Sequence, residues 1–162
     1  MDDAADYTST LPGKRMAAGV LLLDGFGRVL LVEPTYKQGW EFPGGVVMGN
    51  ESPWSAAVRE VKEELGLVLA GPLRLLVADW VPPRDGRTEC VVWLFDGGEV
   101  GAAEVAAIRL PPDELRSFRF VAEGEAAELL PPIRARRLRA ALAVRAGGGS
   151  GLGYLEDAQP PR

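Results

Sequence analysis

Residues 52–67 read SPWSAAVREVKEELGL, and this stretch decides how the chain around it folds. Ser52 is a suitable N-cap, and Pro53 suits the first helical position. Gly66 suits the position just after the last helical turn. The stretch therefore predicts one helix with well-marked ends.

Three glutamates in this helix lie at the spacing i, i+3, i+4: Glu60, Glu63 and Glu64. At about 100° per residue they fall within one wedge of roughly 100°. Apolar residues form an adjoining face that would dock on a sheet: Trp54, Ala57, Val58, Val61 and Leu65. The carboxylates are thus expected together at the edge of the core.

Such clustering is unfavourable for a helix. Like charges at i,i+3 and i,i+4 cost roughly 0.2–0.5 kcal/mol per pair, and the helix dipole repels anions near the C-terminus. A divalent cation would offset this, because Mg²⁺ prefers oxygen ligands. A solvated acidic face is the simpler interpretation of the spacing alone. Gly44 and Gly45, just upstream, favour a metal and phosphate site, since glycines allow close backbone approach.

Composition excludes several classes of enzyme. The 162 residues include no histidine and one cysteine. A Ser-His-Asp or Cys-His relay is therefore impossible, as are a conventional zinc site and an intrachain disulfide. Chemistry must come from carboxylates, Lys or Arg, hydroxyls, or a metal ion held by oxygen.

Charge and hydropathy point to a cytoplasmic protein. The net charge of -5 argues against binding a nucleic acid polymer. The N-terminus is acidic and polar, unlike a signal peptide. The longest apolar stretch, residues 16–23, is too short to span a bilayer, so no membrane partner is expected.

The chain is predicted to hold one domain, over residues 14–146, between a flexible leader (1–13) and a flexible Gly/Pro-rich tail (147–162). A loop is expected over 33–50. Strands are predicted over 15–23, 29–32, 73–81 and 89–95, with weaker candidates at 105–110 and 117–121. Further helices are predicted over 122–129 and 133–144. This order indicates an α/β fold with a mixed sheet between helices.

The region from Gly45 to Leu67 resembles the Nudix box, G-x5-E-x7-R-E-U-x-E-E-x-G-U, in which U is a bulky aliphatic residue. Five residues separate Gly45 from Glu51, and seven more precede REVKEELGL at 59–67. Every fixed position is filled. The preceding WEFPGG (40–45) also resembles the segment that leads into the box, and a weaker resemblance extends over 15–130.

The resemblance implies a Nudix-type α/β/α sandwich and a hydrolase of nucleoside diphosphates linked to another moiety. The expected cofactor is Mg²⁺ or Mn²⁺. By position, the metal ligands are Gly45, through its carbonyl, and Glu60, Glu63 and Glu64. Arg59 is expected to orient a glutamate, and Glu51 to hold the loop or support a metal ligand.

The general base is either a box glutamate or an acid in a later loop. Glu114 is the expected later acid, because residues 112–121 resemble the region that carries it in some relatives. Glu99 is a second choice, and a plain surface acid is the alternative for both.

Two substrate classes remain open. One is a nucleoside triphosphate, hydrolysed as by MutT; the other is ADP-ribose or a nucleotide sugar. Pro82 and Pro83 resemble a mark of the ADP-ribose subgroup but also suit an ordinary turn. The tyrosine typical of diadenosine-polyphosphate hydrolases has no counterpart. A non-catalytic nucleotide-binding sensor domain and a purely structural domain with an acidic helix are the alternatives of other classes.

The expected partners are a small nucleotide derivative and, since Nudix proteins are often homodimers, a second copy of the chain. Some further side chains have two interpretations. Trp40 and Phe42 stack on a base or, as we favour, pack the box against the sheet. Basic side chains near the motif contact phosphate or simply face solvent: Lys37, Arg84 and Arg87. Cys90 is expected in the core.

Overall fold

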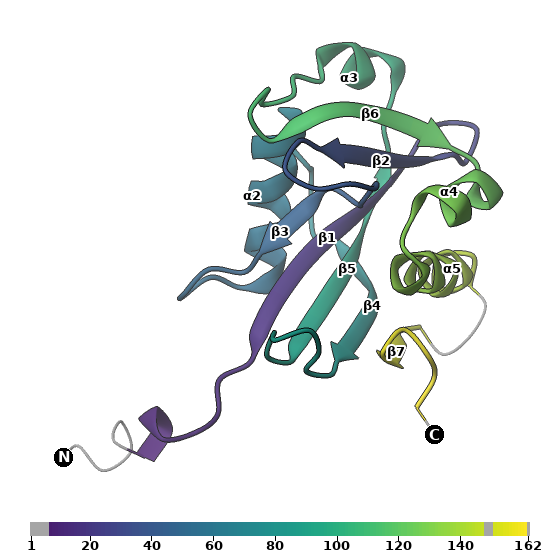
Figure 1. Ribbon diagram of the computed structural model, residues 1–162. Coiled ribbons are helices and arrows are strands. Elements are labelled where there is room, and N and C mark those ends of the chain that lie inside the picture. Colours follow the sequence, from purple (N-terminus) through teal and green to yellow (C-terminus); the bar gives the residue numbers. More distant parts are fainter. Residues whose placement is uncertain (1–6, 148–150, 162) are drawn as a thin grey trace.

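The computed structural model describes residues 7–147 and 151–161. They contain a seven-stranded mixed sheet in the order β6-β2-β1-β5-β4-β7, with β3 paired to β1 off this path (Figure 1). The strands are β1 (Arg15–Leu23), β2 (Val29–Pro34), β3 (Gly44–Val46), β4 (Arg74–Val81), β5 (Cys90–Glu99), β6 (Leu115–Val121) and β7 (Gly153–Glu156). The helices are α2 (Pro53–Leu65), α3 (Ala102–Ala107), α4 (Glu123–Leu129) and α5 (Pro132–Arg145).

Alternation along β1 divides the core into two layers. Ala18, Val20 and Leu22 pack in the cluster that contains Ala56, Ala57, Val61 and Leu65 of α2, whereas Trp54, expected on the same face, is exposed. Leu21 and Leu23 belong to the cluster on the opposite face, with the buried side chains of α4 and α5. A strand whose two faces are both buried reads as a continuous apolar run, as β1 does. The predicted α/β sandwich is confirmed: Figure 1 shows α2 on one side of the sheet and α4 and α5 on the other.

The helix α2 has the predicted ends. The Ser52 hydroxyl accepts a hydrogen bond from the Ser55 amide at 3.0 Å. Gly66 is left-handed, with φ of 71°, and its amide donates to the Lys62 carbonyl at 3.0 Å. Both caps satisfy backbone groups that a helix end leaves unpaired.

Two predictions inside the domain were wrong. Residues 105–110 are not a strand, because the alanine-rich segment 102–107 forms α3, where Glu104 caps the Gly101 amide at 2.8 Å. The expected loop 33–50 contains the strand β3. Two of the three residues of β3 are glycines, which disfavour strands, so the sequence did not predict it.

The C-terminal segment is more ordered than predicted. Residues 153–156 form β7, parallel to β4, and Leu155 and Ala158 are buried. The flexible tail predicted for 147–162 is thus wrong for this part, while residues 148–150 and 162 lie outside the described ones. Within the leader, residues 7–9 form a helical turn, and residues 1–6 lie outside the described part. No helix in the described ranges has the length and apolar content to cross a bilayer.

A buried ion pair joins three elements of the α5 side. Asp79 on β4 is fully buried and accepts from the guanidinium of Arg137 on α5, with Nε–Oδ2 at 3.0 Å. Its other oxygen accepts from the Ala158 amide at 2.9 Å. Burial lowers the pKa of Arg137. Asp79 therefore ties the sheet to α5 and to the C-terminal segment.

We expect Asp79→Ala to lower the free energy of unfolding by about 3–5 kcal/mol, because it leaves a buried guanidinium and a buried amide unpaired. Glu125→Ala is the matched control. It removes one partner of the exposed Arg119–Glu125 pair, which should contribute less than about 1 kcal/mol. Urea denaturation followed by circular dichroism measures both. Equal small losses would contradict a structural role for Asp79.

Candidate active site

Two glycines bring the loop before α2 into close contact with both β1 and α2. Gly44 has φ of 145°, and a Cβ there would lie 2.2 Å from the Ala18 carbonyl oxygen of β1. At Gly45 a Cβ would lie 2.5 Å from Oε1 of Glu60. A side chain at position 44 would force the loop away from β1, whereas one at position 45 would displace the Glu60 carboxylate. The glycines therefore place the backbone of β3 directly against a carboxylate of α2.

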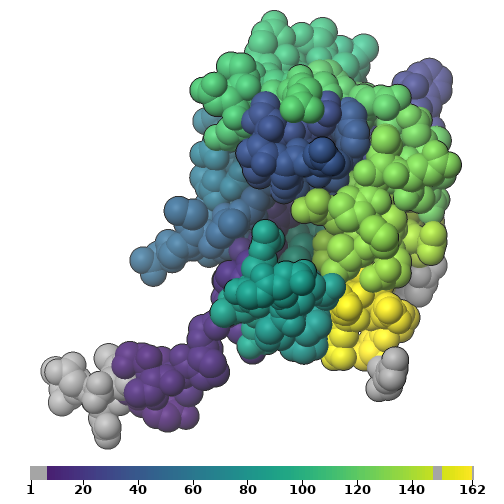
Figure 2. Space-filling model, in the orientation of Figure 1, coloured from purple at the N-terminus to yellow at the C-terminus, as the bar shows by residue number. Residues whose placement is uncertain are grey.

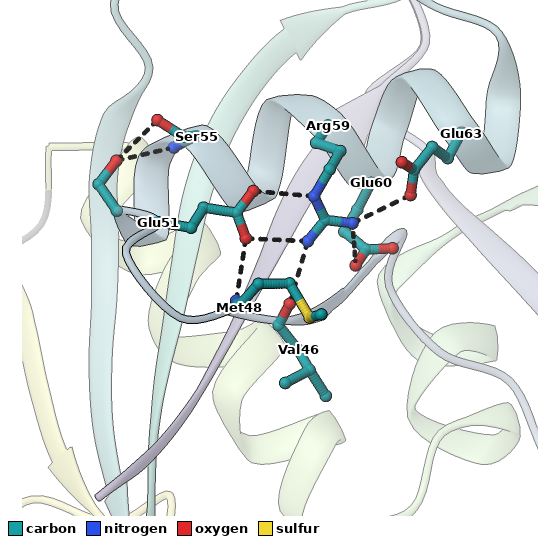
Figure 3. A network of polar contacts seen from close by, with 8 residues as sticks. Val46, Met48, Glu51, Ser55, Arg59, Glu60 and Glu63 are labelled. Carbon is teal, nitrogen blue, oxygen red and sulfur yellow. Dashed lines mark hydrogen bonds and ion pairs between the residues drawn. The ribbon is translucent and has the colours of Figure 1, made fainter. Parts of the chain in front are cut away.

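Arg59 is the centre of the polar network shown in Figure 3. Its Nε and Nη2 donate to the two carboxylate oxygens of Glu51 at 2.8 and 3.0 Å, a bidentate pair. Its Nη1 donates to Glu60 at 2.8 Å and to Glu63 at 3.0 Å. Nη2 also donates to the Val46 carbonyl at 3.1 Å. One guanidinium thus connects the loop, the helix and two of the three helix glutamates.

Glu51 closes the loop between β3 and α2. Besides Arg59, its carboxylate accepts from the Met48 amide at 3.0 Å. The hydrogen bonds from Arg59 and then from Met48 lower the pKa of Glu51 to about 2. The hydrogen bonds to Glu51 and then to Glu60 and Glu63 raise the pKa of Arg59. Both groups stay charged at neutral pH, so the loop keeps its position relative to α2.

The carboxylate of Glu64 has the pKa that departs furthest from its ordinary value among the carboxylates of the site. It is 7% exposed, and its Oε2 accepts from the Gly44 amide at 2.8 Å. Burial raises its pKa to about 8, and the negative charges of Glu60, Glu41 and Glu114 add to this. Burial also raises the pKa of Glu60. A strongly shifted carboxylate in a cleft is typical of functional sites.

The structure brings Glu114, but not Glu99, to this cluster. Glu114 precedes β6, and its carbonyl accepts from the Thr35 amide at 2.9 Å, which joins its turn to the end of β2. Its negative charge contributes to the raised pKa of both Glu60 and Glu64. Glu99 pairs with Leu23, five residues along β1 from Ala18, the partner of Gly45. Five strand residues span about 16 Å, so Glu99 lies away from the cluster.

The donor set of the site suits a hard divalent cation. Carboxylate oxygens of Glu60, Glu63 and Glu64 and the carbonyl of Gly45 are the ligand types that Mg²⁺ and Mn²⁺ prefer. As the side chains lie, no three acidic, His or Cys residues within 7–147 and 151–161 form a ready metal cluster. Arg59 and the Gly44 amide hold the glutamates instead. A bound cation would compete with Arg59 and the Gly44 amide for these carboxylate oxygens.

A pocket of about 300 Å³ borders the two glycines. Figure 2 shows the surface hollowed between the dark blue segment after β2, the teal turn between β4 and β5, and the green helices. Four basic residues contribute to its lining: Lys37, Arg87, Arg134 and Arg137. Buried Glu41, also in the lining, pairs with Lys37 at 2.7 Å and with Arg134 at 3.0 Å. The pocket is thus basic on the side away from the glutamates of α2.

The remaining residues singled out in the sequence lie in the core, pack against it or form an ion pair. Phe42 is buried in the α5-side core and also lines the pocket, while Trp40 packs against the same core. Cys90 is buried, as predicted. Arg84 pairs with Asp157 of the C-terminal segment.

Sequence reasoning missed three residues of the pocket. Glu41 stands beside the recognised Pro-Gly-Gly, which was a usable signal. Arg134 and Arg137 lie on the polar side of a predicted helix. Nothing local showed that this side faces a pocket.

The model of the family described as the NUDIX domain matches residues 13–142, that is 130 of the 162 residues. The chain belongs to the Nudix family. As predicted from the box, the match places it among the Nudix hydrolases.

Solved structures of other proteins share its fold. A MutT protein from Methanosarcina mazei Go1 superposes with a TM-score of 0.66 at 21% identity, covering 86% of this chain and 100% of that one. A UDP-X diphosphatase gives a TM-score of 0.72 at 18% identity, covering 95% of this chain and 74% of that one.

Curated relatives match a shorter stretch. The RNA pyrophosphohydrolase of Hydrogenovibrio crunogenus is 38% identical over 55 residues, 34% of this chain and 33% of that protein. The RNA pyrophosphohydrolase of Pseudomonas aeruginosa is 38% identical over 64 residues, 40% of each. The chain therefore spans only about a third of the length of these relatives.

We expect the stability that Glu64 contributes to decrease as the pH rises. Its pKa is about 8 in the folded chain and near 4.5 when unfolded, so folding favours the protonated form. The contribution is complete below pH 4.5 and is lost as the pH rises through 8. Each pKa unit corresponds to about 1.4 kcal/mol, so the loss is a few kcal/mol.

The measurement is the free energy of unfolding in urea, with EDTA, from pH 5 to 9. Glu64→Gln should remove most of the decrease, because an amide does not ionise. Glu63→Gln is the matched control, since the Glu63 side chain is 55% exposed. Parallel pH profiles for the wild type and Glu64→Gln would contradict the assignment.

Proposed function

We propose that the chain is a metal-dependent pyrophosphohydrolase of a nucleoside diphosphate linked to another moiety, of MutT type. The observation that carries this is the contact of Gly45 with Glu60, beside Glu64 and at the rim of a basic pocket. A cluster of carboxylates beside a pocket that is lined by basic side chains suits a substrate that carries phosphates, because a metal ion and the basic side chains can both bind phosphate oxygens.

In this proposal Mg²⁺ or Mn²⁺ is held by Glu60, Glu63, Glu64 and the Gly45 carbonyl. The bound cation would neutralise the pyrophosphate and make water a better nucleophile. Arg59 keeps Glu60 and Glu63 on one side of α2, and Glu51 holds Arg59 by two hydrogen bonds. Arg59 is thus a positioning residue that orients the ligands.

Glu114 is the proposed general base. Its carboxylate has no hydrogen-bond or ion-pair partner in the described part of the chain, so no existing contact has to break before it meets a water molecule. It lies close enough to Glu60 and Glu64 for its charge to affect both. A general base must be within reach of the attacking water, and a carboxylate can take this role without a histidine.

The substrate in this proposal is a small nucleotide derivative. A volume of about 300 Å³ is at the small end of ligand pockets. The fold neighbours and relatives are named for MutT activity, for UDP-X and for RNA, so each class belongs in a substrate screen.

We expect Glu63→Gln and Glu64→Gln to lower kcat for the best substrate at least about 100-fold, because an amide is a poor ligand for Mg²⁺ and a poor base. The screen should cover dNTPs, oxidised dGTP, ADP-ribose, nucleotide sugars and RNA with a 5′-triphosphate, each with Mg²⁺ and Mn²⁺. Product identification shows which P–O bond breaks.

Glu128→Gln, on the exposed face of α4, is the matched control and should keep wild-type turnover. Far-UV circular dichroism should be unchanged for all three variants. Full activity of both Glu63→Gln and Glu64→Gln would defeat the proposed roles. Tight nucleotide binding without hydrolysis under any metal would favour the non-catalytic sensor domain instead.

A further inference from the structure

We propose that Arg87 binds a phosphate group of the substrate, and that the C-terminal turn around Asp157 holds Arg87 over the pocket. This inference rests on the proposed function, because it concerns the same pocket. It concerns residues that the Nudix box does not include, and a segment beyond residues 13–142.

Arg87 differs from the other basic residues of the pocket. Lys37 and Arg134 are paired with Glu41, and Arg137 is paired with buried Asp79. In the part of the chain that the structure describes, the guanidinium of Arg87 has no hydrogen bond or ion pair, although Arg87 lines the pocket together with Gly44 and Gly45. A guanidinium without a partner can bind an anion without first breaking an existing pair.

A tight turn fixes Arg87 relative to Arg84. The Arg87 amide donates to the Arg84 carbonyl at 2.9 Å, and the Arg84 amide donates to the Arg87 carbonyl at 3.2 Å. The two residues between them, Asp85 and Gly86, have φ of 51° and 73°. These values fit the two-residue hairpin turn in which both central residues are left-handed. Whatever holds Arg84 therefore also holds Arg87.

The C-terminal segment holds Arg84. Asp157 forms an ion pair with Arg84, and its amide donates to the Trp80 carbonyl of β4 at 2.8 Å. The next residue, Ala158, donates its amide to Asp79 at 2.9 Å. Figure 2 shows the yellow C-terminal segment against the teal hairpin that carries Arg84. Backbone hydrogen bonds to β4 thus fix the position of Asp157, and its side chain pairs with Arg84 of the hairpin.

The turn at Asp157 is held in an unfavourable conformation. Asp157 and Ala158 have φ of 55° and 57°, which is uncommon for residues other than glycine. Such backbone persists where the surroundings enforce it, and here Glu156 and Gln159 pair across the turn. Contacts on both sides therefore fix the place from which Asp157 reaches Arg84.

Phosphate is the ligand that suits Arg87. A guanidinium presents paired donors that match phosphate oxygens. Arg87 lines the pocket together with Gly44 and Gly45 but comes from the β4–β5 hairpin, the teal segment that borders the hollow in Figure 2. We therefore propose that the Arg87 guanidinium contacts a phosphate of the bound nucleotide and does not contact the glutamates of α2.

The test combines Arg87→Ala, Asp157→Ala and the double variant. Affinity for a non-hydrolysable α,β-methylene nucleoside triphosphate with Mg²⁺ is measured by calorimetry, and KM and kcat are measured with the best substrate. We expect Arg87→Ala to weaken binding and raise KM about tenfold, with kcat little changed. Asp157→Ala should weaken binding about threefold. The double variant should match Arg87→Ala, because Asp157 acts through Arg87.

Two variants control for charge and for the segment itself. Arg139→Ala removes an exposed arginine of α5 that does not line this pocket, and it should bind as the wild type does. Glu156→Ala alters the C-terminal segment but removes only the contact with the Tyr154 hydroxyl, and it too should bind normally. Thermal melting of every variant should agree within a few degrees.

Wild-type affinity in Arg87→Ala would overturn the proposal, and so would failure of the wild type to bind the analogue. Losses that add fully in the double variant would overturn the role of Asp157. The analogue separates this proposal from the proposed function, because its binding requires no hydrolysis. Reduced analogue binding by Arg87→Ala in a chain that hydrolyses nothing would support the phosphate contact and refute the hydrolase.

Discussion

The absence of side chains at Gly44 and Gly45 is the constraint on which the site depends. A Cβ at Gly44 would collide with the backbone of β1, and one at Gly45 would collide with the carboxylate of Glu60. The loop can therefore lie this close to β1 only where residue 44 is glycine, and a side chain at residue 45 would displace the Glu60 carboxylate. This approach allows the Gly44 amide to reach Glu64. It also opens the pocket on the other side of the same backbone.

Arg59 resolves the electrostatic problem that the glutamates of α2 create. Three carboxylates within one wedge near a helix C-terminus repel each other and the helix dipole. The guanidinium contacts Glu60 and Glu63 and is itself held by Glu51. Glu64 has no cationic partner among residues 7–147 and 151–161, and burial raises its pKa. The site thus combines two carboxylates paired with the Arg59 guanidinium, those of Glu60 and Glu63, with the buried carboxylate of Glu64, whose charged form burial disfavours.

Features with local signals could be predicted from the sequence. Ser52, Pro53 and Gly66 mark the ends of α2, and the spacing of the glutamates places them on one face of it. Local composition also misled in one place. The apolar segment 105–110 suggested a strand, although alanines just before it favour the helix α3.

Features that depend on distant contacts could not be predicted. β7 forms because β4 offers it an edge, and a tail rich in glycine and proline contains no sign of this. The buried pair of Asp79 and Arg137 joins residues 58 positions apart. Glu114 was preferred over Glu99 only by resemblance, and the distance of Glu99 from the cluster follows from the register of β1 with β5, which the sequence does not give.

We propose that Glu60, Glu63, Glu64 and the Gly45 carbonyl hold a divalent cation beside the pocket. The most direct measurement is a crystal structure with Mn²⁺ and a non-hydrolysable nucleotide, in which anomalous scattering locates the metal. We expect Mn²⁺ within about 2.5 Å of carboxylate oxygens of Glu60 and Glu64 and of the Gly45 carbonyl, with the nucleotide phosphates in the adjoining pocket. Mn²⁺ bound elsewhere, or these side chains still held by Arg59 and Gly44 beside a bound nucleotide, would contradict the account.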